Sequence, residues 1–230
     1  TPNPARPSIH NYLGTDDRGR DVLARLIYGF RLSVLFAFVL TAIGIIIGIF
    51  FGAIQGYFAG RVDLYMQRFI EIWSSMPELY ILIIFSSLFE PSIFLLIVLL
   101  SLFGWMSLSD YVRAEFLKGR NMEYVVAART LGLSNTKIIL KHILPNSMVS
   151  VITFLPFRIS GAILILTSLD FLGLGVPPDT PSLGELLAQG KENIEAWWLS
   201  LSTFLVLVGT LLLLIFIGEG IRESLDSRSS

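Results

Sequence analysis

The sequence has no cysteine and little charge. Its 230 residues include 17 Lys and Arg and 18 Asp and Glu, so 15% are charged and the formal net charge is −1. Soluble domains usually carry about 25% charged residues. Without cysteine the chain forms no disulfide, cysteine-ligated zinc site or iron–sulfur cluster. The balanced charge gives no sign of a nucleic-acid partner.

Residue patterns typical of catalytic and metal sites are also missing. The two histidines, His10 and His142, are too few and too far apart for a histidine-rich metal site. The sequence has no G-x-x-x-x-G-K-S/T phosphate loop, no H-E-x-x-H and no G-x-S-x-G. We therefore expect no catalytic, cofactor-binding or metal site in this chain.

Apolar residues are abundant, at 53% of the chain, and the mean hydropathy is +0.71. Crossing about 30 Å of hydrocarbon takes about 20 helical residues. Three runs of this length carry no charge, and two others carry only isolated charges. The predicted spans are 32–60, 69–89, 91–109, 147–169 and 196–218. The sequence thus predicts an all-α integral membrane protein with five spans in a lipid bilayer.

The first 31 residues are expected to lie before the first span. They are polar and proline-rich, lack the apolar core of a signal peptide and begin with Thr1 rather than methionine. This start favours a fragment with at least one more span upstream. The predicted organisation is a segment of residues 1–31 followed by a transmembrane domain of residues 32–230.

The orientation follows from the basic residues of the loops, because cytoplasmic loops are enriched in Lys and Arg. Residues 113–146 have a net charge of +4 and residues 170–196 have −4, so we place the first loop in the cytoplasm and the second outside. Counting spans then puts residues 1–31 outside. That segment carries five arginines against three aspartates, which the charge rule alone would place inside.

Several residues within the spans have a specific geometry. Glycines at 44, 48, 52 and 56 form one strip along a helix, which indicates close helix packing or, alternatively, a glycine-lined conduit. Pro77 and Pro156 interrupt spans as hinges or static bends. Charged residues inside spans are functional candidates. Arg158 could meet a substrate carboxylate, pair with Glu78 or face a cavity, and both are kept as possible pathway residues.

The basic loop contains the most specific pattern of the chain. From residue 121 it reads NMEYVVAARTLGLSNTKIILKHILPN. Ala127 and Ala128 predict a short helix that ends at Gly132. Ser134 can cap a second helix over 135–143, which Pro145 should stop. Two interpretations remain open for this helix–turn–helix: a knob that a soluble partner grips, or an amphipathic loop lying on the bilayer.

The stretch resembles the E-A-A loop of binding-protein-dependent ABC importer permeases, whose pattern is E-A-A, three residues, G, nine residues and I-x-L-P. The matching positions are Ala127, Ala128, Gly132, Leu144 and Pro145, and the departures are Val126 and His142. Further stretches resemble the oligopeptide, dipeptide and nickel branch of that family. They are LGTDDRGRDVLARLIYG at 13–29, RAEF at 113–116 and SLDFLGLGVPPDTPSLGELLAQG at 168–190.

The resemblance implies a type I ABC importer transmembrane domain, which has six spans and both ends in the cytoplasm. The first span would then be missing here, which agrees with an external segment 1–31. The loop around 113–146 would be the coupling loop, docking into a separate ATPase subunit that binds the ATP and Mg²⁺. The residues implied in this coupling are Val125, Val126, Ala127, Ala128, Arg129, Leu131, Gly132 and Leu133.

The resemblance also implies further partners. A second, usually different permease subunit would complete the pathway, and a periplasmic binding protein would deliver peptides to the acidic loop, which could instead be a solvated loop without a docking role. The chain would then be a multi-pass protein of the bacterial inner membrane.

Three other functions remain open. A nickel or other small-solute ABC permease would share the same motifs. An ion-coupled secondary transporter would use Arg158 and Glu78 but would leave the Ala-Ala-x3-Gly pattern unexplained. A membrane scaffold without transport activity is the third.

Overall fold

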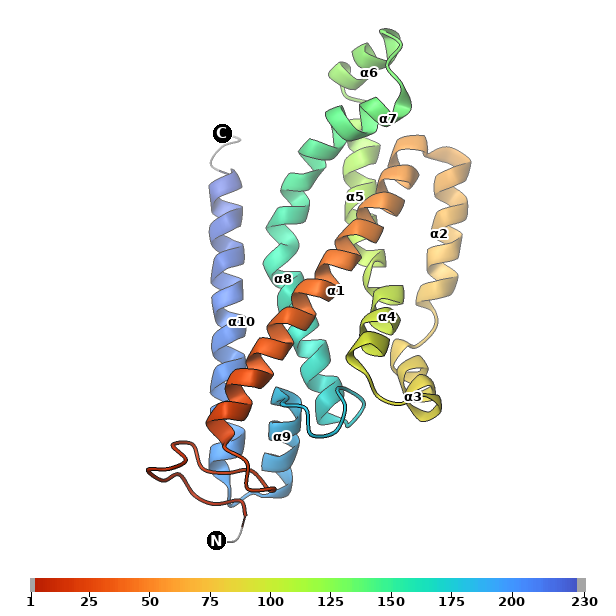
Figure 1. Ribbon diagram of the computed structural model, residues 1–230. Helices are drawn as coiled ribbons and strands as arrows, with labels where there is room; N and C mark the ends of the chain where they lie inside the picture. The colour runs from red at the N-terminus through yellow and green to blue at the C-terminus, as the bar shows by residue number, and fades with distance from the viewer. Residues whose placement is uncertain (1–2, 227–230) are drawn as a thin grey trace. The chain divides into compact units, whose positions relative to one another are not determined.

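The computed structural model describes residues 3–226, and every regular element in them is helical (Figure 1). The α-helices are α1 Val22–Phe58, α2 Gly60–Ser74, α3 Glu78–Leu88, α4 Ile93–Gly104, α5 Met106–Gly119, α6 Glu123–Thr130, α7 Asn135–Ile138, α8 Leu144–Phe171, α9 Leu183–Glu192 and α10 Trp197–Asp226. A π-helical turn, Ile139–Ile143, joins α7 to α8. The described residues contain no β-strand, so the predicted all-α class is confirmed.

The predicted spans correspond to long apolar helices. Within residues 3–226, four segments are long and apolar enough to cross a membrane: Val22–Phe58, Ile93–Gly119, Asn135–Phe171 and Trp197–Leu225. The fifth predicted span falls on α2 and α3, which together qualify but are bent by 62°. Pro77 lies in this break, where its missing N–H removes a helical hydrogen bond. By contrast, α8 continues through Pro156.

The first helix starts ten residues earlier than the predicted span. Arg25 and Arg31 suggested a polar segment before residue 32, but both lie within α1. Asp21 precedes the helix, and its carboxylate accepts a hydrogen bond from the backbone N–H of Ala24 at 3.0 Å. This bond satisfies one of the free amides of the first turn. The helix therefore begins at a local cap, ahead of the apolar run that set the predicted boundary at residue 31, and that boundary stays a prediction.

The chain forms two compact units. Unit 1 comprises residues 3–39, 82–98 and 156–217, and unit 2 comprises residues 40–81, 99–155 and 218–226. Unit 1 holds the N-terminal segment and α9, whereas unit 2 holds α2, α5, α6 and α7. Helices α1, α3, α4, α8 and α10 each contribute to both units.

The glycine strip of α1 packs against α5 within unit 2. A Cβ atom on Gly48 would lie 3.0 Å from the Cβ of Leu108, and one on Gly52 would lie 2.6 Å from the carbonyl oxygen of Ser109. A Cβ on Gly56 would lie 2.5 Å from the carbonyl oxygen of Arg113. Such distances leave room only for hydrogen. For these three glycines the packing interpretation is confirmed, because lipid provides no hydrophobic drive and close approach must supply the contact.

Replacing Gly52 with alanine should destabilise the protein by about 1–3 kcal/mol, because the added methyl group would push α5 away from α1. Thermal unfolding of the purified protein in detergent measures this loss. Gly209→Ala in α10 is the control, since nothing lies within 4 Å of the added Cβ and alanine favours a helix. Equal stability of the two variants would contradict the packing role of the strip.

Candidate functional site

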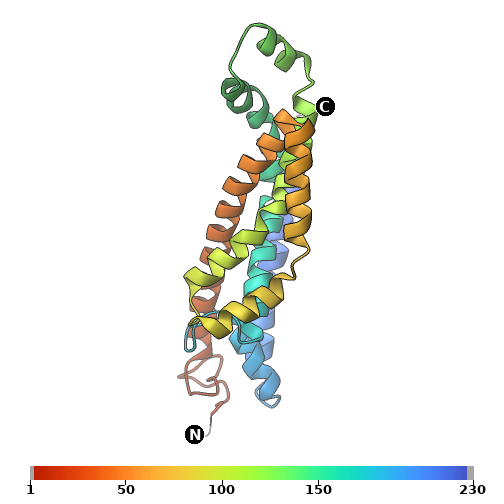
Figure 2. The ribbon, with the colours of Figure 1, turned by 90° about the vertical axis from the view of Figure 1, so that its right-hand side faces the viewer.

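Residues 120–143 connect α5 to α8 and form the α6–α7 loop, which lies beyond the ends of those two helices (Figures 1 and 2). Helix α6 ends at Thr130, and the predicted terminating glycine follows it at Gly132, whose φ is +81°. The N–H of Gly132 donates to the carbonyl of Arg129 at 3.0 Å, and the N–H of Leu133 donates to that of Ala128 at 3.2 Å. This pair of bonds is a Schellman motif, which glycine favours because it has no Cβ.

One face of α6 belongs to the core of unit 2. Val125 is 0% exposed and Ala128 is 5% exposed, and both pack in a cluster with Ile138 of α7 and Phe116 of α5. The spacing of three residues puts Val125 and Ala128 on the same side of the helix. The loop is therefore fixed to the helices below it by apolar burial.

Tyr57, near the end of α1, also holds the α6–α7 loop in place through side-chain contacts. Its hydroxyl donates to Oδ1 of Asn135 at 2.7 Å, and the guanidinium carbon of Arg129 lies 5.7 Å from the centre of its ring. The side chain of Asn146 also donates to the hydroxyl of Tyr124 at 3.0 Å. The sequence reading missed Tyr57, because nothing in the α1 sequence indicates a contact 78 positions further along.

The opposite face of α6 is open. Val126 is 47% exposed and Leu131 is 80% exposed. Together with four polar and small residues they line a shallow hollow. The six lining residues are Asn121, Glu123, Val126, Ala127, Thr130 and Leu131. An apolar surface on a knob fixed to the core is suited to contact with a soluble protein.

The eight predicted coupling residues thus fall into two groups. Five are exposed: Val126, Ala127, Arg129, Leu131 and Gly132. Val125 and Ala128 are buried, and Leu133 is half-buried against the core of unit 2. Their role in coupling stays a prediction, but direct contact with a partner is open only to the exposed group.

The connection to α8 differs from the prediction. Pro145 does not end the second helix but stands in the first turn of α8, after a π-helical turn. The N–H of Leu144 donates to the carbonyl of Ile139, five residues earlier. The wider turn accommodates a proline that has no N–H and would crowd the preceding turn. Ser134 stands at the predicted capping position, but its side chain makes no capping hydrogen bond.

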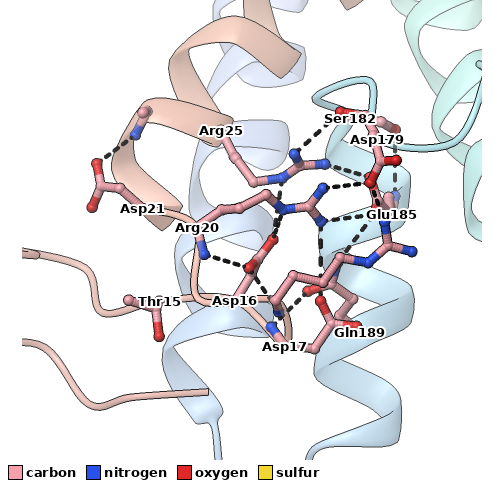
Figure 3. A network of polar contacts seen from close by, with 12 residues as sticks. Thr15, Asp16, Asp17, Arg20, Asp21, Arg25, Asp179, Ser182, Glu185 and Gln189 are labelled. Carbon is pink, nitrogen blue, oxygen red and sulfur yellow. Dashed lines mark hydrogen bonds and ion pairs between the residues drawn. The ribbon is translucent and has the colours of Figure 1, made fainter. Parts of the chain in front are cut away.

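A second polar site lies in unit 1, where the N-terminal segment meets α9 (Figure 3). We call it the arginine cluster. It consists of Asp16, Arg18, Arg20, Arg25, Asp179 and Glu185. Three arginines therefore meet three carboxylates.

Asp16 is the centre of this cluster and is 0% exposed. It accepts hydrogen bonds from Nε of Arg20 at 2.6 Å and from the backbone N–H groups of Arg18 at 3.0 Å and Arg20 at 2.8 Å. Nε of Arg25 lies 3.5 Å from the same carboxylate. A buried carboxylate with several donors is the arrangement that offsets the cost of its burial.

Glu185 on α9 forms ion pairs with the guanidinium groups of two arginines. Nη2 of Arg25 is 2.5 Å from its Oε2, and Nη2 of Arg20 is 3.3 Å from its Oε1. Burial alone would lower the pKa of Arg20, but the hydrogen bond and charge of Asp16 and the charge of Glu185 outweigh it and raise that pKa. Asp179 pairs with Arg18 and Arg20 at the surface. The cluster thus ties the start of α1 to α9.

Helix α9 is itself held close to α8. Ser182 caps α9 by accepting a hydrogen bond from the N–H of Glu185 at 3.3 Å, and its hydroxyl donates to Asp170 at 2.5 Å. A Cβ on Gly184 would lie 2.5 Å from that of Asp170, so only glycine fits there. Asp170 also accepts from the N–H of Val176 at 2.8 Å.

The sequence reading singled out residues 13–29 and 168–190 as separate stretches and missed that they meet. The signal available was that residues 168–190 carry three acidic and no basic residues, whereas residues 13–29 carry three arginines. The sequence analysis also counted the arginines of the N-terminal segment as evidence against an external position, because basic residues are enriched on the cytoplasmic side. The structure shows that three of those five arginines take part in ion pairs.

The two candidate pathway residues lie in different units. Glu78 begins α3 in unit 2 and Arg158 lies within α8 in unit 1, and both are partly buried. Their pairing and their contact with a substrate remain predictions. Among residues 3–226, no group of three or more His, Cys, Asp or Glu side chains could hold a metal ion.

Comparison with known proteins decides the family. Residues 44–230 match the family model described as "Binding-protein-dependent transport system inner membrane component". The chain belongs to this family. The match covers most of the chain, including the α6–α7 loop, and confirms the resemblance inferred from the loop pattern. Members of the family are inner-membrane components, in agreement with the several apolar helices found here.

Among the relatives of this inner-membrane component are two proteins named YejE. The chain is 56% identical over 220 residues to "Peptidoglycan transport system permease protein YejE" of Agrobacterium fabrum, covering 96% of this chain and 58% of that protein. It is 54% identical over 225 residues to "Inner membrane ABC transporter permease protein YejE" of Escherichia coli, covering 98% and 66%. The chain therefore spans less than two thirds of the length of these two relatives.

Two more distant proteins are also similar to this chain. The chain is 38% identical to the oligopeptide transport system permease protein OppC of Haemophilus influenzae, covering 97% of this chain and 73% of that protein. A solved structure of the MetNI methionine ABC transporter in an inward-facing conformation has a TM-score of 0.70 at 17% identity, covering 87% of this chain and 96% of that chain. This likeness establishes the type I importer fold.

Proposed function

We propose that the chain is the permease subunit of an ABC importer that moves peptides across the inner membrane. The observation that carries the proposal is the α6–α7 loop, which is fixed to the core by Val125 and Ala128 and presents Val126 and Leu131 outward. In this proposal a separate ATPase subunit binds ATP and Mg²⁺ and grips the exposed face. Closure of the ATPase dimer would then move the loop as a rigid body and shift the spans between two packings.

The names of the relatives support a peptide-like cargo. They are named for peptidoglycan, oligopeptide and dipeptide transport. A peptide chain is the chemical feature that these cargoes share. Peptidoglycan fragments are a second candidate, favoured by the relative from Agrobacterium fabrum. A nickel or other small-solute permease is the remaining alternative within the family.

Two further partners belong to the proposal. A second permease subunit of related sequence would complete the pathway, since a single chain of this type encloses none. A binding protein would deliver the cargo to the side of the arginine cluster. The ion pairs of Arg18, Arg20 and Arg25 support an external position for this cluster, because their charges are compensated by Asp16, Asp179 and Glu185.

The proposal predicts that the full-length protein, purified with the products of its neighbouring genes, retains an ATPase subunit. In lipid vesicles the complex should take up a radiolabelled tripeptide only when ATP and the binding protein are both present. Omitting ATP, and replacing it with a non-hydrolysable analogue, are the controls. Uptake that follows an ion gradient without ATP would instead establish a secondary transporter and contradict the proposal.

A further inference from the structure

Tyr57 lies where α1 meets both helices of the α6–α7 loop. It is 4% exposed and belongs to the core cluster of unit 2, together with Val125 of α6 and Ile138 of α7. Its hydroxyl donates to Oδ1 of Asn135 at the start of α7, at 2.7 Å. The guanidinium carbon of Arg129 of α6 lies 5.7 Å from the centre of its ring, within the range of a cation–π contact. One buried side chain thus contacts both helices of the loop.

The chain itself does not join α1 directly to the loop. Residues 120–143 continue from α5 and lead into α8, so movement of the loop reaches those two helices through the backbone. Along the chain, α2, α3 and α4 separate α1 from α5, so α1 must follow the loop through packing and side-chain contacts. Apolar packing is non-directional, whereas the hydrogen bond from Tyr57 to Asn135 fixes one atom against another.

The corner that follows Tyr57 has a strained backbone. Ala59 has φ +51° and ψ −156°, a region that residues with a Cβ rarely adopt. Such a conformation persists only where the surrounding structure holds it. The N–H of Ala59 donates to the carbonyl of Gln55 at 2.9 Å, and its carbonyl accepts from the N–H of Asp63 at 3.4 Å. The corner therefore joins α1 to α2 as a fixed bend rather than as a free hinge.

Beyond this corner, polar side chains hold α2 against α5 and α1. Nε and Nη2 of Arg113 donate to the two oxygens of Asp63 at 2.5 and 2.6 Å. A bidentate pair of this kind is among the stronger side-chain contacts. Nε2 of Gln67 donates at 2.8 Å to Oε1 of Gln55, which is 0% exposed. A displacement of Tyr57 is therefore carried into α2 as well as α1.

We propose that Tyr57 is the positioning residue that makes α2 and the adjoining end of α1 follow the α6–α7 loop during transport. This inference rests on the proposed function and adds the residue through which movement of the loop reaches these helices. Tyr57 acts through Asn135 and Arg129 and does not touch the ATPase subunit itself, because it is buried. Its hydroxyl should therefore affect the coupling of hydrolysis to uptake and not the binding of the ATPase subunit.

The first test removes the hydroxyl and keeps the ring. In lipid vesicles that contain the complete complex, Tyr57→Phe should lower the uptake of radiolabelled trialanine per ATP hydrolysed about fivefold, the shift that loss of one neutral hydrogen bond produces in an equilibrium. The affinity for the ATPase subunit and the melting temperature should stay close to those of the wild type. The ring remains packed in this variant, and the exposed Asn135 can bond to water instead.

Tyr124→Phe is the matched control. The hydroxyl of Tyr124 also belongs to the loop, and it accepts a hydrogen bond from Nδ2 of Asn146 at 3.0 Å. Asn146 lies in α8, which the chain already joins to the loop. Loss of this bond should leave uptake per ATP unchanged. An equal loss in the two Phe variants would overturn the proposal, because the contact with α1 would then have no special role.

The second test asks whether Tyr57 acts through Asn135. Asn135→Ala removes the acceptor and should produce the same loss as Tyr57→Phe. The double variant should lose no more than either single variant, because both changes break the same contact. Losses that multiply would overturn the proposal. Wild-type uptake per ATP in Tyr57→Phe would do the same, and so would release of the ATPase subunit by this variant, which would indicate a merely structural role.

A further measurement separates this inference from the proposed function. The binding protein should stimulate ATP hydrolysis by the wild-type complex, and this stimulation should be smaller in Tyr57→Phe, because the binding protein reaches the ATPase subunit only through the permease. If the wild-type complex moves no peptide but Tyr57→Phe still loses stimulation, the peptide cargo is wrong and the role of Tyr57 stands. If the wild type takes up peptide and the two proteins have equal uptake per ATP and equal stimulation, the proposed function stands and Tyr57 is not the link.

Discussion

Replacement of Leu131 by aspartate should detach the ATPase subunit from the purified complex and abolish ATP-dependent uptake. Leu131 is 80% exposed at the rim of the hollow on α6. Exposed apolar residues that become buried at the centre of an interface often contribute 2 kcal/mol or more, and a carboxylate there would also be buried without a partner. We expect an affinity loss of at least about 30-fold. Titration of the solubilised permease with the ATPase subunit measures it.

The matched control for this prediction is Leu140→Asp. Leu140 is also an exposed leucine of the α6–α7 loop, but it lies in the π-helical turn and outside the hollow. Its replacement should leave the ATPase bound. A complex that keeps its ATPase after Leu131→Asp, or loses it equally after both changes, would remove the hollow from the coupling site. Ala128 is unsuitable for such a test, because a carboxylate there would disrupt the core of unit 2.

Loss of the charge of Asp16 should produce the largest change in stability. The Asp16→Asn variant leaves the buried guanidinium of Arg25 and part of Arg20 without their shared counter-charge. Removal of one member of a buried ion pair costs about 3–5 kcal/mol, because the other charge stays buried. For a chain of this size the melting temperature in detergent should fall by roughly 6–20 °C. Thermal unfolding followed by circular dichroism measures the shift.

Asp179→Ala is the control for the arginine cluster. Asp179 pairs with Arg18 and Arg20 at the surface, and its side chain is 68% exposed. Exposed pairs of this kind contribute about 0–1 kcal/mol, so the melting temperature should change little. If the Asn variant of Asp16 and the Ala variant of Asp179 melt together, the burial of Asp16 does not carry the stability of the cluster.

The α6–α7 loop shows how far sequence reasoning reached. The pattern from Ala127 to Gly132 predicted a short helix and its glycine end, since both depend on neighbouring residues. The same spacing could have separated the two faces of α6, because Val125 and Ala128 stand three residues apart. The continuation through Pro145 was not predictable in this way, because the π-helical turn before it lies between Ile138 and Ile143, which pack with distant segments in the core of unit 2.

The sequence by itself determined the membrane class, the approximate spans, the family and the place of the loop. Each of these follows from the length of apolar runs or from motifs of neighbouring residues, which are local properties of the chain. Only the tertiary structure decided which face of α6 is open, where α1 begins and which charges compensate one another. Arg25 and Glu185 stand 160 positions apart, and Arg113 and Asp63 stand 50 positions apart. Such pairings depend on the packing of distant segments, and local sequence does not encode it.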